Sequence, residues 1–504
     1  MASTLVGTTM DPHSNNVDSV CLIQDEIQFS NHKISRKGLM KLAWVTALAL
    51  RLLCVMGECK QPGAPAPATS LAHYAPSCRA HRASIKDFGG VGDGSTSNTK
   101  AFRDAVAHLS QFSAQGGALL YVPPGRWLTG GFNLTSNFTL FLDRDAVLLA
   151  SQDMNEWPLI DPLPSYGRGR DAPGARYSNF IFGTNLTDVV ITGNNGTIDG
   201  QGEFWWDKFH KKELKYTRGY LIEFVYTTGI VISNITLLNS PSWNVHPVYS
   251  RNIVVQGITI LAPVNSPNTD GIDPDSCSQV WIQDCYIVSG DDCIAIKSGW
   301  DEYGIRVNMP SEYIYIKGLT CISPTSAVIA LGSEMSGGIQ NVFAEDITTI
   351  DSEVGVRVKS APGRGGFVRG IYVRGMTMKN MKYAFNSKGF YKDHADDKYN
   401  PKALPVVNGI SLSNMVVENA TMAAKMEGIQ SAPYTGICIS NVTISLAPRK
   451  CETPPAWNCT DVHGVSGDVS PVPCRQLSPG SQKSPCPFPL ERVPIHKPKL
   501  ELCT

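Results

Sequence analysis

The sequence predicts an all-β protein: a single-domain, right-handed parallel β-helix of about ten coils with an N-terminal capping helix. Three observations predict this fold. A motif of alternating apolar residues recurs along the chain, the period within each motif is two residues, and Gly, Asn, Asp or Ser turns separate the motifs. The composition is that of a folded chain, since 42% of the 504 residues are hydrophobic and 17% are charged.

The motif recurs from residue 188 to residue 444. Its period of two indicates short β-strands with one buried face, and stacking equivalent turns buries surface that single strands cannot. A β-sandwich ranks well behind, because it would show turns every ~8–12 residues without the longer recurrence. The repeats, which start roughly 23 to 41 residues apart, are DVVITG (188–193), GIVISNITL (229–237), NIVVQGITI (252–260), QVWIQDCYI (279–287), YIYIKGLTC (313–321), NVFAEDITT (341–349), GIYVRGMTM (370–378), GISLSNMVV (409–417) and GICISNVTI (436–444).

A leader precedes this region. Residues 1–57 end in an apolar run, 42–57, that follows several Lys and Arg residues and is broken only by Arg51. The run is short for a membrane span, so a signal peptide cut near Gly57 is preferred over an uncleaved signal anchor. Met40 is an alternative start that would give an ordinary signal peptide.

The rest of the chain divides by composition. Residues 58–80 are predicted as a Pro/Ala-rich linker, residues 81–448 as the β-helix domain and residues 449–504 as a Pro/Cys-rich tail, a disulfide-stapled covering loop without the repeat. At the start of the domain, the apolar spacing of residues 99–112 predicts a helix, with Thr99 or Asn98 as N-cap, that covers the first coil.

Cysteines and glycosylation sequons indicate the secretory pathway. The 14 cysteines follow no paired CxxC zinc pattern, and cleavage near Gly57 would leave 12, an even number that permits full pairing in disulfides. Among them, Cys277, Cys285 and Cys293 are expected to be buried thiols or to form a bridge. The eight Asn-x-Ser/Thr sequons, typical of a secreted glycoprotein, begin at Asn133, Asn137, Asn185, Asn195, Asn234, Asn419, Asn441 and Asn458.

The charge balance limits the classes of binding partner that can be expected. The chain has 44 Lys and Arg residues against 44 Asp and Glu residues, so nucleic acid and an anionic membrane have no support as main partners. A membrane would be involved only through an uncleaved leader, by way of residues 42–57. A charged substrate must therefore be recognised locally.

Three acids fall on one line of the repeat. Asp270 lies 21 and 22 residues before Asp291 and Asp292, about one coil, and equivalent residues of stacked coils lie only ~4.8 Å apart. Neighbouring residues of a strand face opposite sides, so both members of the pair reach one groove only where the strand bends, and Gly290 offers that bend. The three carboxyl groups are expected to converge on one surface patch.

A basic pair follows two coils later. Arg357 and Lys359 are spaced i, i+2 and share one face of a strand. Acids beside a basic pair suit an enzyme whose substrate carries carboxylates. With the opening segment IKDFGGVGDGSTSNTKAF (85–102), the ordered motifs NTDGID (268–273), GDDC (290–293) and RVK (357–359) resemble the polygalacturonases of glycoside hydrolase family 28 over roughly residues 80 to 445.

The resemblance implies inverting, single-displacement hydrolysis of α-1,4-linked galacturonan in pectin. It implies that Asp291 is the general acid, that Asp270 and Asp292 hold and deprotonate the attacking water, and that Arg357 and Lys359 bind substrate carboxylates. Inversion requires two carboxyl groups ~6.5–9.5 Å apart. Further candidates for substrate binding are Asn268, in the first motif, and Arg364, close to the basic pair in sequence. Tyr391 is a weaker candidate for a sugar contact.

One family feature is absent. The family usually has Gly-His-Gly between GDDC and Arg-x-Lys, whereas this chain has Ser326 or Ala327 at the position of the histidine. No histidine lies between His246 and His394. His246, about one coil before Asp270, is a candidate substrate contact, with a structural role as the alternative. The segment GSEMSGG (332–338) resembles the exo-acting branch of the family.

The expected protein is a secreted, cell-wall, exo-acting glycosidase that works as a monomer on an acidic polysaccharide, with no cofactor or metal. Two alternatives stay open: a hydrolase of rhamnogalacturonan or another acidic glycan, and a wall-bound pectin-binding protein that has lost turnover with the histidine. Trp205 and Trp206 are either a sugar-stacking platform or a cover for the first coils, and the cover is favoured.

Overall fold

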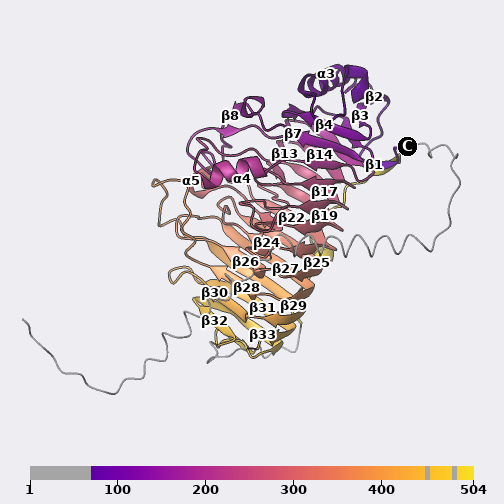
Figure 1. Cartoon of the computed structure of the whole chain (residues 1–504). Coiled ribbons are helices and arrows are strands. Elements are labelled where there is room, and N and C mark those ends of the chain that lie inside the picture. Colours follow the sequence, from indigo (N-terminus) through magenta and orange to yellow (C-terminus); the bar gives the residue numbers. More distant parts are fainter. Residues whose placement is uncertain (1–69, 449–454, 480–484) are drawn as a thin grey trace, which may run out of the picture. The chain divides into compact units, whose positions relative to one another are not determined.

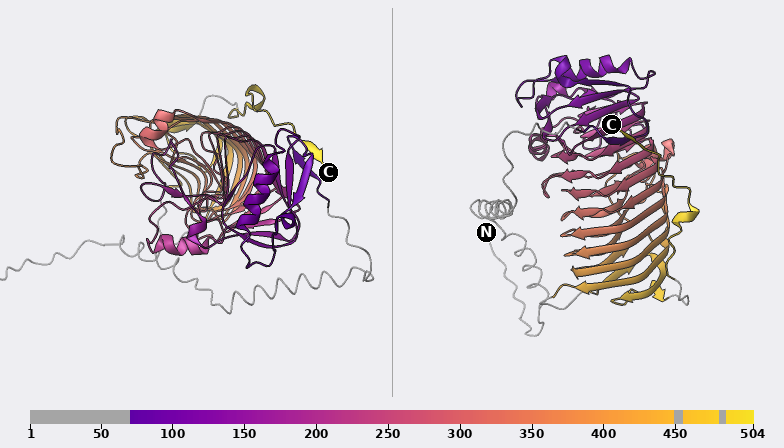
Figure 2. Two further views of the ribbon diagram at one scale, coloured as in Figure 1. Left: turned by 90° about the horizontal axis from the view of Figure 1, so that it is seen from above. Right: turned by 90° about the vertical axis from the view of Figure 1, so that its right-hand side faces the viewer.

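The computed structural model describes residues 70–448, 455–479 and 485–504, which belong to one compact unit. The predicted leader, residues 1–57, lies outside the described residues. Parallel strands stack in three ladders along one axis, which confirms the parallel β-helix (Figures 1 and 2). Within the part of the chain that is described, no helix combines the length and the apolarity that crossing a membrane requires.

The first ladder carries the repeat found in the sequence. Its strands, all paired in parallel, are β2 (His81–Ser84), β3 (Ala118–Val122), β6 (Phe138–Leu142), β11 (Thr187–Gly193), β14 (Thr228–Ser233), β17 (Arg251–Gln256), β19 (Ser278–Gln283), β22 (Ser311–Lys317), β25 (Ile339–Ile350), β27 (Phe367–Lys379), β29 (Val406–Ala420), β31 (Tyr434–Leu446), β33 (Val462–Ser470) and β34 (Leu477–Pro479).

Stacked aliphatic side chains form the core beneath this ladder. One residue of each sequence repeat occupies the same register position, and all nine are buried. Because equivalent aliphatic side chains pack on one another along the axis, each coil buries apolar surface that a single short strand could not bury alone. The row runs through Val189, Ile230, Ile253, Val280, Ile314, Val342, Ile371, Ile410 and Ile437.

A second ladder follows the first after a short turn and merges with it at β25. Many of these turns place Asn or Asp at positive φ, as at Asn195 (67°) and Asn234 (53°), where these residues are less strained than other non-glycine residues. The second ladder contains β4 (Gly125–Thr129), β7 (Ala146–Ala150), β12 (Thr197–Asp199), β15 (Thr236–Leu238), β18 (Thr259–Leu261), β20 (Tyr286–Val288) and β23 (Thr320–Ile322).

The third ladder carries the predicted site. It consists of two sheets that single-residue parallel bridges join, from Val245 to Ile272 and from Ile272 to Ile294. The first sheet contains β5 (Phe132–Asn133), β10 (Ile181–Thr184), β13 (Ile222–Val225) and β16 (Val245–Val248). The second contains β21 (Ile294–Ile296), β24 (Ala327–Leu331), β26 (Val354–Lys359), β28 (Tyr383–Lys388), β30 (Met422–Glu427) and β32 (Trp457–Thr460).

Helices occur at the first coils and in the loops beside the third ladder. Helix α3 (Thr99–Ser110) lies within the predicted segment and packs its apolar face, including Phe102 and Leu109, into the core of the first coils. Asn98 is its N-cap residue but makes no side-chain cap hydrogen bond. The remaining helices are α4 (Glu203–His210), α5 (Asp301–Val307) and the 3₁₀ turns η1 (Ile85–Phe88), η2 (Met154–Glu156) and η3 (Leu490–Arg492).

Two predicted boundaries are wrong. The β-helix does not end at residue 448, because β32, β33 and β34 continue the ladders up to Pro479. The linker does not extend to residue 80, since β1 (His73–Ala75) pairs antiparallel with β35 (Glu501–Cys503) and Cys78 bonds to Cys503. Figure 2 shows yellow β35 beside the indigo N-terminal strands. A short antiparallel pair, β8 (Leu159–Ile160) with β9 (Arg176–Tyr177), lies in a loop near the site.

The described end of the tail is a stapled cover, as predicted. Cys438–Cys486 and Cys459–Cys474 tie it to the last coils, and Cys78–Cys503 ties it to the first. Full pairing of the cysteines is not reached, because Cys277 and Cys285 are buried free thiols.

Candidate active site

The third ladder stacks two of the three acids. Asp270 and Asp292 each stand two residues before a bridged position, Ile272 and Ile294, so they occupy the same place on consecutive coils. Backbone hydrogen bonding fixes this register, since the Gly271 amide donates to the carbonyl of Asp292 over 2.9 Å. One carboxylate oxygen each of Asp270, Asp291 and Asp292 lies within 4.8 Å of the others. The convergence predicted from the repeat is therefore present.

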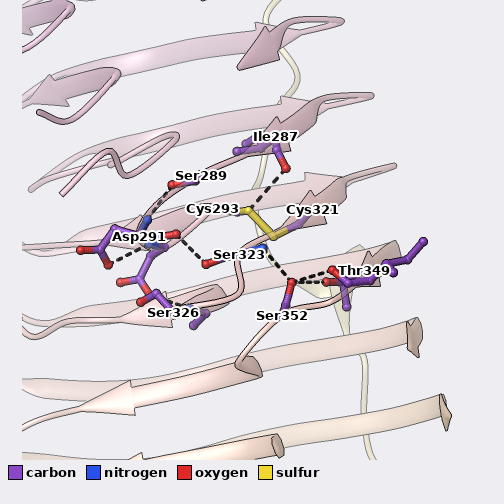
Figure 3. The surroundings of a disulfide bond; sticks show 12 residues. Ile287, Ser289, Asp291, Cys293, Cys321, Ser323, Ser326, Thr349 and Ser352 are labelled. Carbon is purple, nitrogen blue, oxygen red and sulfur yellow. Dashed lines mark hydrogen bonds between the residues drawn. A yellow bond between two sulfur atoms is a disulfide. The ribbon is translucent and has the colours of Figure 1, made fainter. Parts of the chain in front are cut away.

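The turn before Asp291 needs glycine because the backbones approach closely. A Cβ on Gly290 would lie 2.1 Å from the carbonyl oxygen of Ser266, closer than atoms pack. Behind the turn, the disulfide Cys293–Cys321 joins this coil to the next (Figure 3). Cys293 thus forms the bridge that the sequence left as one alternative.

Serines of the turn and of the next coil hold Asp291. Its backbone amide donates to Ser289 Oγ over 3.0 Å, and its carbonyl accepts from Ser323 Oγ over 2.7 Å (Figure 3). Its side chain accepts from Asn268 Nδ2 over 3.3 Å. Unlike the other two acids, Asp291 is only partly buried. It is the member of the cluster that a ligand reaches most easily.

Asp292 is fully buried and ionised. Lys359 Nζ donates to Oδ2 over 2.6 Å, while Ser326 Oγ and the Ala327 amide donate to Oδ1 over 2.5 and 2.9 Å. Burial raises the pKa of this carboxyl group, but the positive charges of Lys359 and Arg357 outweigh burial and lower the pKa below its usual value. Both oxygens are occupied by donors.

Asp270 has the opposite electrostatic state. Its side chain is 3% exposed, and Oδ1 has no hydrogen-bond partner in the protein. Burial and the neighbouring charge of Asp291 raise its pKa to about 8, although Lys297 Nζ lies 3.6 Å from Oδ2. The buried neighbours Asp270 and Asp292 therefore differ in protonation at neutral pH, as acid–base catalysis requires.

A cavity of about 390 Å³ lies in front of the acids. Four of the predicted residues line it: Asn268, Asp270, Asp291 and Lys359. So does Tyr391, the weaker candidate. Three further cations, which the sequence did not single out, line the same cavity: Arg168, Arg170 and Lys297. The cavity therefore offers several positive charges beside its carboxylates.

The additional cations are held by acids and aromatic rings. Arg170 donates from Nε to Glu334 over 2.8 Å, and its guanidinium lies 4.4 Å from the centre of the Trp300 ring. Lys297 Nζ donates to Glu334 over 3.3 Å and lies 4.3 Å from the ring centre of Trp243. The acid pair lies just before β21 and Lys297 directly after it, so the alternation of that strand could have identified Lys297, whereas Arg170 lies in a loop without periodicity.

Asp273, in the same motif as Asp270, also escaped the sequence reasoning. It is fully buried, and neither carboxyl oxygen has a hydrogen-bond partner in the protein. Burial and the nearby charge of Asp270 raise its pKa well above the usual value, so this carboxyl group is neutral.

The two arginines predicted to bind substrate, Arg357 and Arg364, are not among the residues that line the cavity. Arg357 pairs with Glu353 and donates to Ser326 Oγ over 3.3 Å, so it lies behind Asp292 and lowers the pKa of that acid. Arg364 is fully buried and pairs with Asp301. The expectation that Arg364 binds substrate is wrong, because the loops beside the groove enclose its side chain.

His246 is not a substrate contact either. Its ring is fully buried and lies between two carboxylates, with Nδ1 2.8 Å from Glu223 and Nε2 3.3 Å from Asp275. Burial lowers the pKa of the imidazole, but the hydrogen bonds to the two acids outweigh burial and raise it above its usual value. Arg176 completes the network with 2.7 Å bonds to both oxygens of Glu223. The structural alternative for His246 holds.

Sequence comparison places this site in a known family. The chain matches the profile of glycosyl hydrolases family 28 over residues 170–472, more than half of its length, and this match includes all three acids. The chain belongs to glycosyl hydrolases family 28. A probable polygalacturonase of Vitis vinifera is 63% identical over 462 residues, covering 91% of this chain and 93% of the relative.

Solved family 28 structures share the fold. A hyperthermoactive exopolygalacturonase from Thermotoga maritima superimposes with a TM-score of 0.67 at 27% identity, covering 81% of this chain and 94% of that one. The family 28 exopolygalacturonase of Yersinia enterocolitica has a TM-score of 0.63 at 19% identity, covering 78% of this chain and 76% of that one. The β-helix is thus the fold expected of a family 28 glycosidase.

In this family 28 chain, Ser326 or Ala327 stands where the resemblance implies a histidine. Ser326 donates to Asp292 and accepts from Arg357, so it links the buried acid to the cation behind it. An imidazole does enter the cavity from elsewhere: His394, on the loop between β28 and β29, is among the lining residues. Its Nδ1 lies 3.0 Å from Asp301 Oδ2, and its ring stacks on Tyr399 at 3.6 Å.

Trp205 and Trp206 cover the coils of this family 28 chain, which was the favoured interpretation, and do not form a sugar-stacking platform. Trp205 is fully buried and packs edge-on against Trp157 and Tyr177, and Trp206 is also buried, so both cover the coils. Trp243 and Trp300 line the cavity instead.

Two ammonium groups lie beside the acid cluster, since Lys359 bonds to Asp292 and Lys297 lies beside Asp270.

Proposed function

We propose that this glycosidase cleaves α-1,4-galacturonosyl linkages of pectin. The observation that carries the proposal is the cavity itself, in which Arg168, Arg170, Lys297 and Lys359 surround the three clustered acids. A polymer with one carboxylate on each sugar matches such a lining, because guanidinium and ammonium groups bind carboxylates strongly. The name of the Vitis vinifera relative, a probable polygalacturonase, supports the same substrate.

The proposed reaction is a single displacement by water, with inversion at the anomeric carbon. The separation of the acids alone favours retention of configuration instead. Their oxygens lie within 4.8 Å of one another, closer than the ~6.5–9.5 Å between the carboxyl groups of most inverting enzymes. The environment of the carboxylates supports inversion instead. Asp292 has donors on both oxygens and no exposure, so it cannot form a covalent bond to a sugar. This favours attack by a water molecule over attack by Asp292.

Asp291 is the general acid in this proposal. The pKa order alone would favour Asp270, which keeps its proton up to about pH 8. Asp270 is 3% exposed, however, whereas Asp291 is partly exposed in the cavity and therefore reaches the glycosidic oxygen. We assign the stored proton to Asp270 and its delivery to the glycosidic oxygen to Asp291. Once its own proton has passed to Asp291, Asp270 is ionised and accepts the proton of the attacking water, which Asp292 helps to orient.

Exo-action fits the loops around the cavity. The loop between β8 and β9 meets the loop between β28 and β29, more than 220 residues later in the chain. Arg168 Nη1 donates to the carbonyl of Ala395 over 2.8 Å, and Arg170 Nη2 donates to Asp393 Oδ2 over 2.5 Å. These bonds form a wall beside the acids, which suits binding of a chain end. The exopolygalacturonase of Thermotoga maritima, at 27% identity, supports this mode.

We further propose a secreted, glycosylated monomer of the cell wall. Seven of the eight sequon asparagines are exposed and Asn137 is partly exposed, so glycans could be attached without disturbing the core. The four disulfides among the described residues suit an oxidising compartment. N-terminal sequencing of the mature protein tests cleavage near residue 57 of the leader.

The test is product analysis on purified protein with polygalacturonate. Release of monomeric galacturonate from the start of the reaction is the expected result, and early release of mixed oligomers would contradict exo-action. The absence of the family's histidine, with Ser326 or Ala327 at its position, favours one second candidate, a pectin-binding protein without turnover. Binding of polygalacturonate with no product, under conditions where a family 28 exopolygalacturonase is active, would establish that candidate instead. Rhamnogalacturonan, run in parallel, tests the other acidic glycan.

A further inference from the structure

Glu334 connects two cations of the catalytic cavity that come from different parts of the chain. Its side chain lies between β24 and β25, lines the cavity and is only 2% exposed. Oε1 accepts from Arg170 Nε over 2.8 Å, and Oε2 accepts from Lys297 Nζ over 3.3 Å. The backbone carbonyl of Glu334 also accepts from the Ser298 amide over 2.6 Å. The carboxylate of Glu334 is therefore fixed between a loop arginine and a lysine of the third ladder.

The ammonium group of Lys297 is shared between two carboxylates. Nζ lies 3.3 Å from Glu334 Oε2 and 3.6 Å from Asp270 Oδ2, and the centre of the Trp243 ring lies 4.3 Å from it. The side chains of both ion pairs are at most 4% exposed, so solvent ions screen these charges little. Because attraction to one carboxylate limits the approach of Lys297 to the other, Glu334 controls how strongly Lys297 stabilises the charge of Asp270.

Three buried aspartates of the site show what a cation does to a carboxyl group here. Burial raises the pKa of Asp292, but the ammonium of Lys359, 2.6 Å away, outweighs burial and lowers it. Neither oxygen of Asp273 has a hydrogen-bond partner among the described residues, and burial raises its pKa well above the usual value. Asp270, with its shared lysine, lies between these extremes, since burial raises its pKa to about 8. A group in this range can both hold a proton and release it during a reaction.

Two lysines act on both Glu334 and Asp270. The charged groups that act on Asp270 are Asp273, Asp291, Asp292, Lys297 and Lys359, and those that act on Glu334 are Arg170, Lys297, Lys359 and Arg364. Of the two shared lysines, only Lys297 pairs directly with both carboxylates, whereas Lys359 pairs with Asp292. A change at Glu334 therefore reaches Asp270 through Lys297.

We propose that Glu334 is a positioning residue, which holds Lys297 back from Asp270 and so leaves Asp270 able to alternate between its protonated and ionised forms. The same carboxylate fixes Arg170, so one side chain sets both a cation of the cavity wall and the acid that stores the proton. The inference rests on the proposed function, because the proposed reaction gives Asp270 this cycle. It goes further in assigning a role to a carboxylate that does not itself react.

Titration of the Asp270 carboxyl group tests this without catalysis. Infrared difference spectroscopy follows the C=O band of a protonated carboxyl group on both sides of the pKa of about 8, and loss of the band in Asp270→Asn assigns it. Glu334→Gln frees Lys297 to approach Asp270, so the midpoint of the titration should fall by about one pH unit. An unchanged midpoint in Glu334→Gln would overturn the proposal.

Glu345 provides a matched control. It is also a buried glutamate that accepts from an arginine and a lysine, but it lies in β25 outside the cavity lining. Glu345→Gln should leave the midpoint of the titration unchanged. An equal shift in this variant would show that the effect does not come from the cavity, which would overturn the proposal.

A shift in the reverse direction provides a second arm that misfolding cannot imitate. Lys297→Met removes the ammonium group, so the midpoint of Asp270 should rise by about one pH unit or more. Glu334→Gln should then move the midpoint much less than it does when Lys297 is present, because Lys297 carries the coupling. Equal effects with and without Lys297 would mean that Glu334 acts on Asp270 directly, which would overturn the positioning role.

Steady-state kinetics connects the titration to the reaction. Glu334→Gln should move the alkaline limb of kcat/KM to lower pH by the same amount as the infrared midpoint. A loss of activity that is equal at every pH would mean that Glu334 only supports the structure, and it would overturn the proposal. Failure of the unaltered protein to hydrolyse polygalacturonate would refute the proposed function, while the infrared titration would still decide the role of Glu334.

Discussion

Asp292 and Lys359 form a buried ion pair although 67 residues separate them in the chain, with Nζ 2.6 Å from Oδ2. The pair crosses two coils of the third ladder, from the turn before β21 to the end of β26. The Lys359 charge counters the effect of burial on the carboxyl pKa, which keeps Asp292 ionised. Lys359, which lines the cavity, therefore controls the protonation state of Asp292, the acid to which we assign the orientation of water.

Replacing Lys359 should shift the acidic limb of the pH profile. Without the ammonium, burial dominates and the pKa of Asp292 rises, so Lys359→Met should lose activity at low pH first. The acidic limb of kcat/KM should move upward by about one pH unit or more. Lys359→Arg, which keeps the charge, is the matched control. A uniform loss of activity at every pH would mean that Lys359 only binds substrate.

The two other acids should differ in their pH effects. Asp291→Asn removes the proposed general acid, so kcat should fall about 10²–10⁴-fold at every pH. Asp270→Asn removes the group whose pKa is about 8, so the alkaline limb of the profile should change along with the rate. Steady-state kinetics from pH 4 to 9 on both variants measures this. An alkaline limb that persists in Asp270→Asn would assign the stored proton elsewhere.

Ser326 should contribute through Asp292. Ser326→Ala removes a 2.5 Å donor from a buried carboxylate and should lower kcat about tenfold or more, since hydrogen bonds to charged groups contribute ~1.5–3 kcal/mol. Ser326→Thr keeps the hydroxyl and is the control. Ser323→Ala, which touches only the backbone of Asp291, should have a smaller effect on kcat.

His246 should affect stability and not substrate binding. His246→Ala leaves Glu223 and Asp275 short of a buried partner, and breaking such a network costs about 3–5 kcal/mol. Because the folded pKa of His246 is raised, its contribution is complete below about pH 6.5 and is lost as the pH rises through the folded value. Denaturant unfolding at pH 5 and pH 9 should show the larger deficit at pH 5. An increased KM at temperatures where the variant is folded would contradict the structural role.

Arg170 should control which products form. Arg170→Ala removes the bond to Asp393 and one cavity cation, so the wall beside the acids should open and oligomeric products should join the monomer. The KM for short oligogalacturonates should also rise, by about tenfold for one lost carboxylate contact. Chromatography of the early products measures the first effect. Lys208→Ala, outside the cavity lining, is the control and should leave the product pattern unchanged.

The sequence repeat predicted the positions of residues that the register between stacked coils determines. Its period places Asp270 and Asp292 on consecutive coils, because the same ladder that stacks Ile272 on Ile294 stacks the residues before them. Loops obey no such period, so Arg170 and His394, which reach the cavity from loops, were not identified. Burial depends on neighbouring coils as well, and this is why the sequence leaves both a substrate contact and a structural role open for His246, which aligns with Glu223 in the third ladder.

The last coils were missed for a different reason. Strand β33 contains glycine, serine and a half-exposed Val465, so its alternation is too weak to indicate a strand without the neighbour on which it stacks. Its pairing with β31 supplies the order that the local sequence lacks.

The disulfide between Cys78 and Cys503, 425 residues apart, makes the intervening polypeptide a covalent ring. A protease that cuts one loop of this ring, such as the segment 389–401 beside the active site, converts it to an open chain but releases no fragment. Two cuts are needed before any piece can leave. A single nick would therefore leave the molecule whole until a reductant reached the bond.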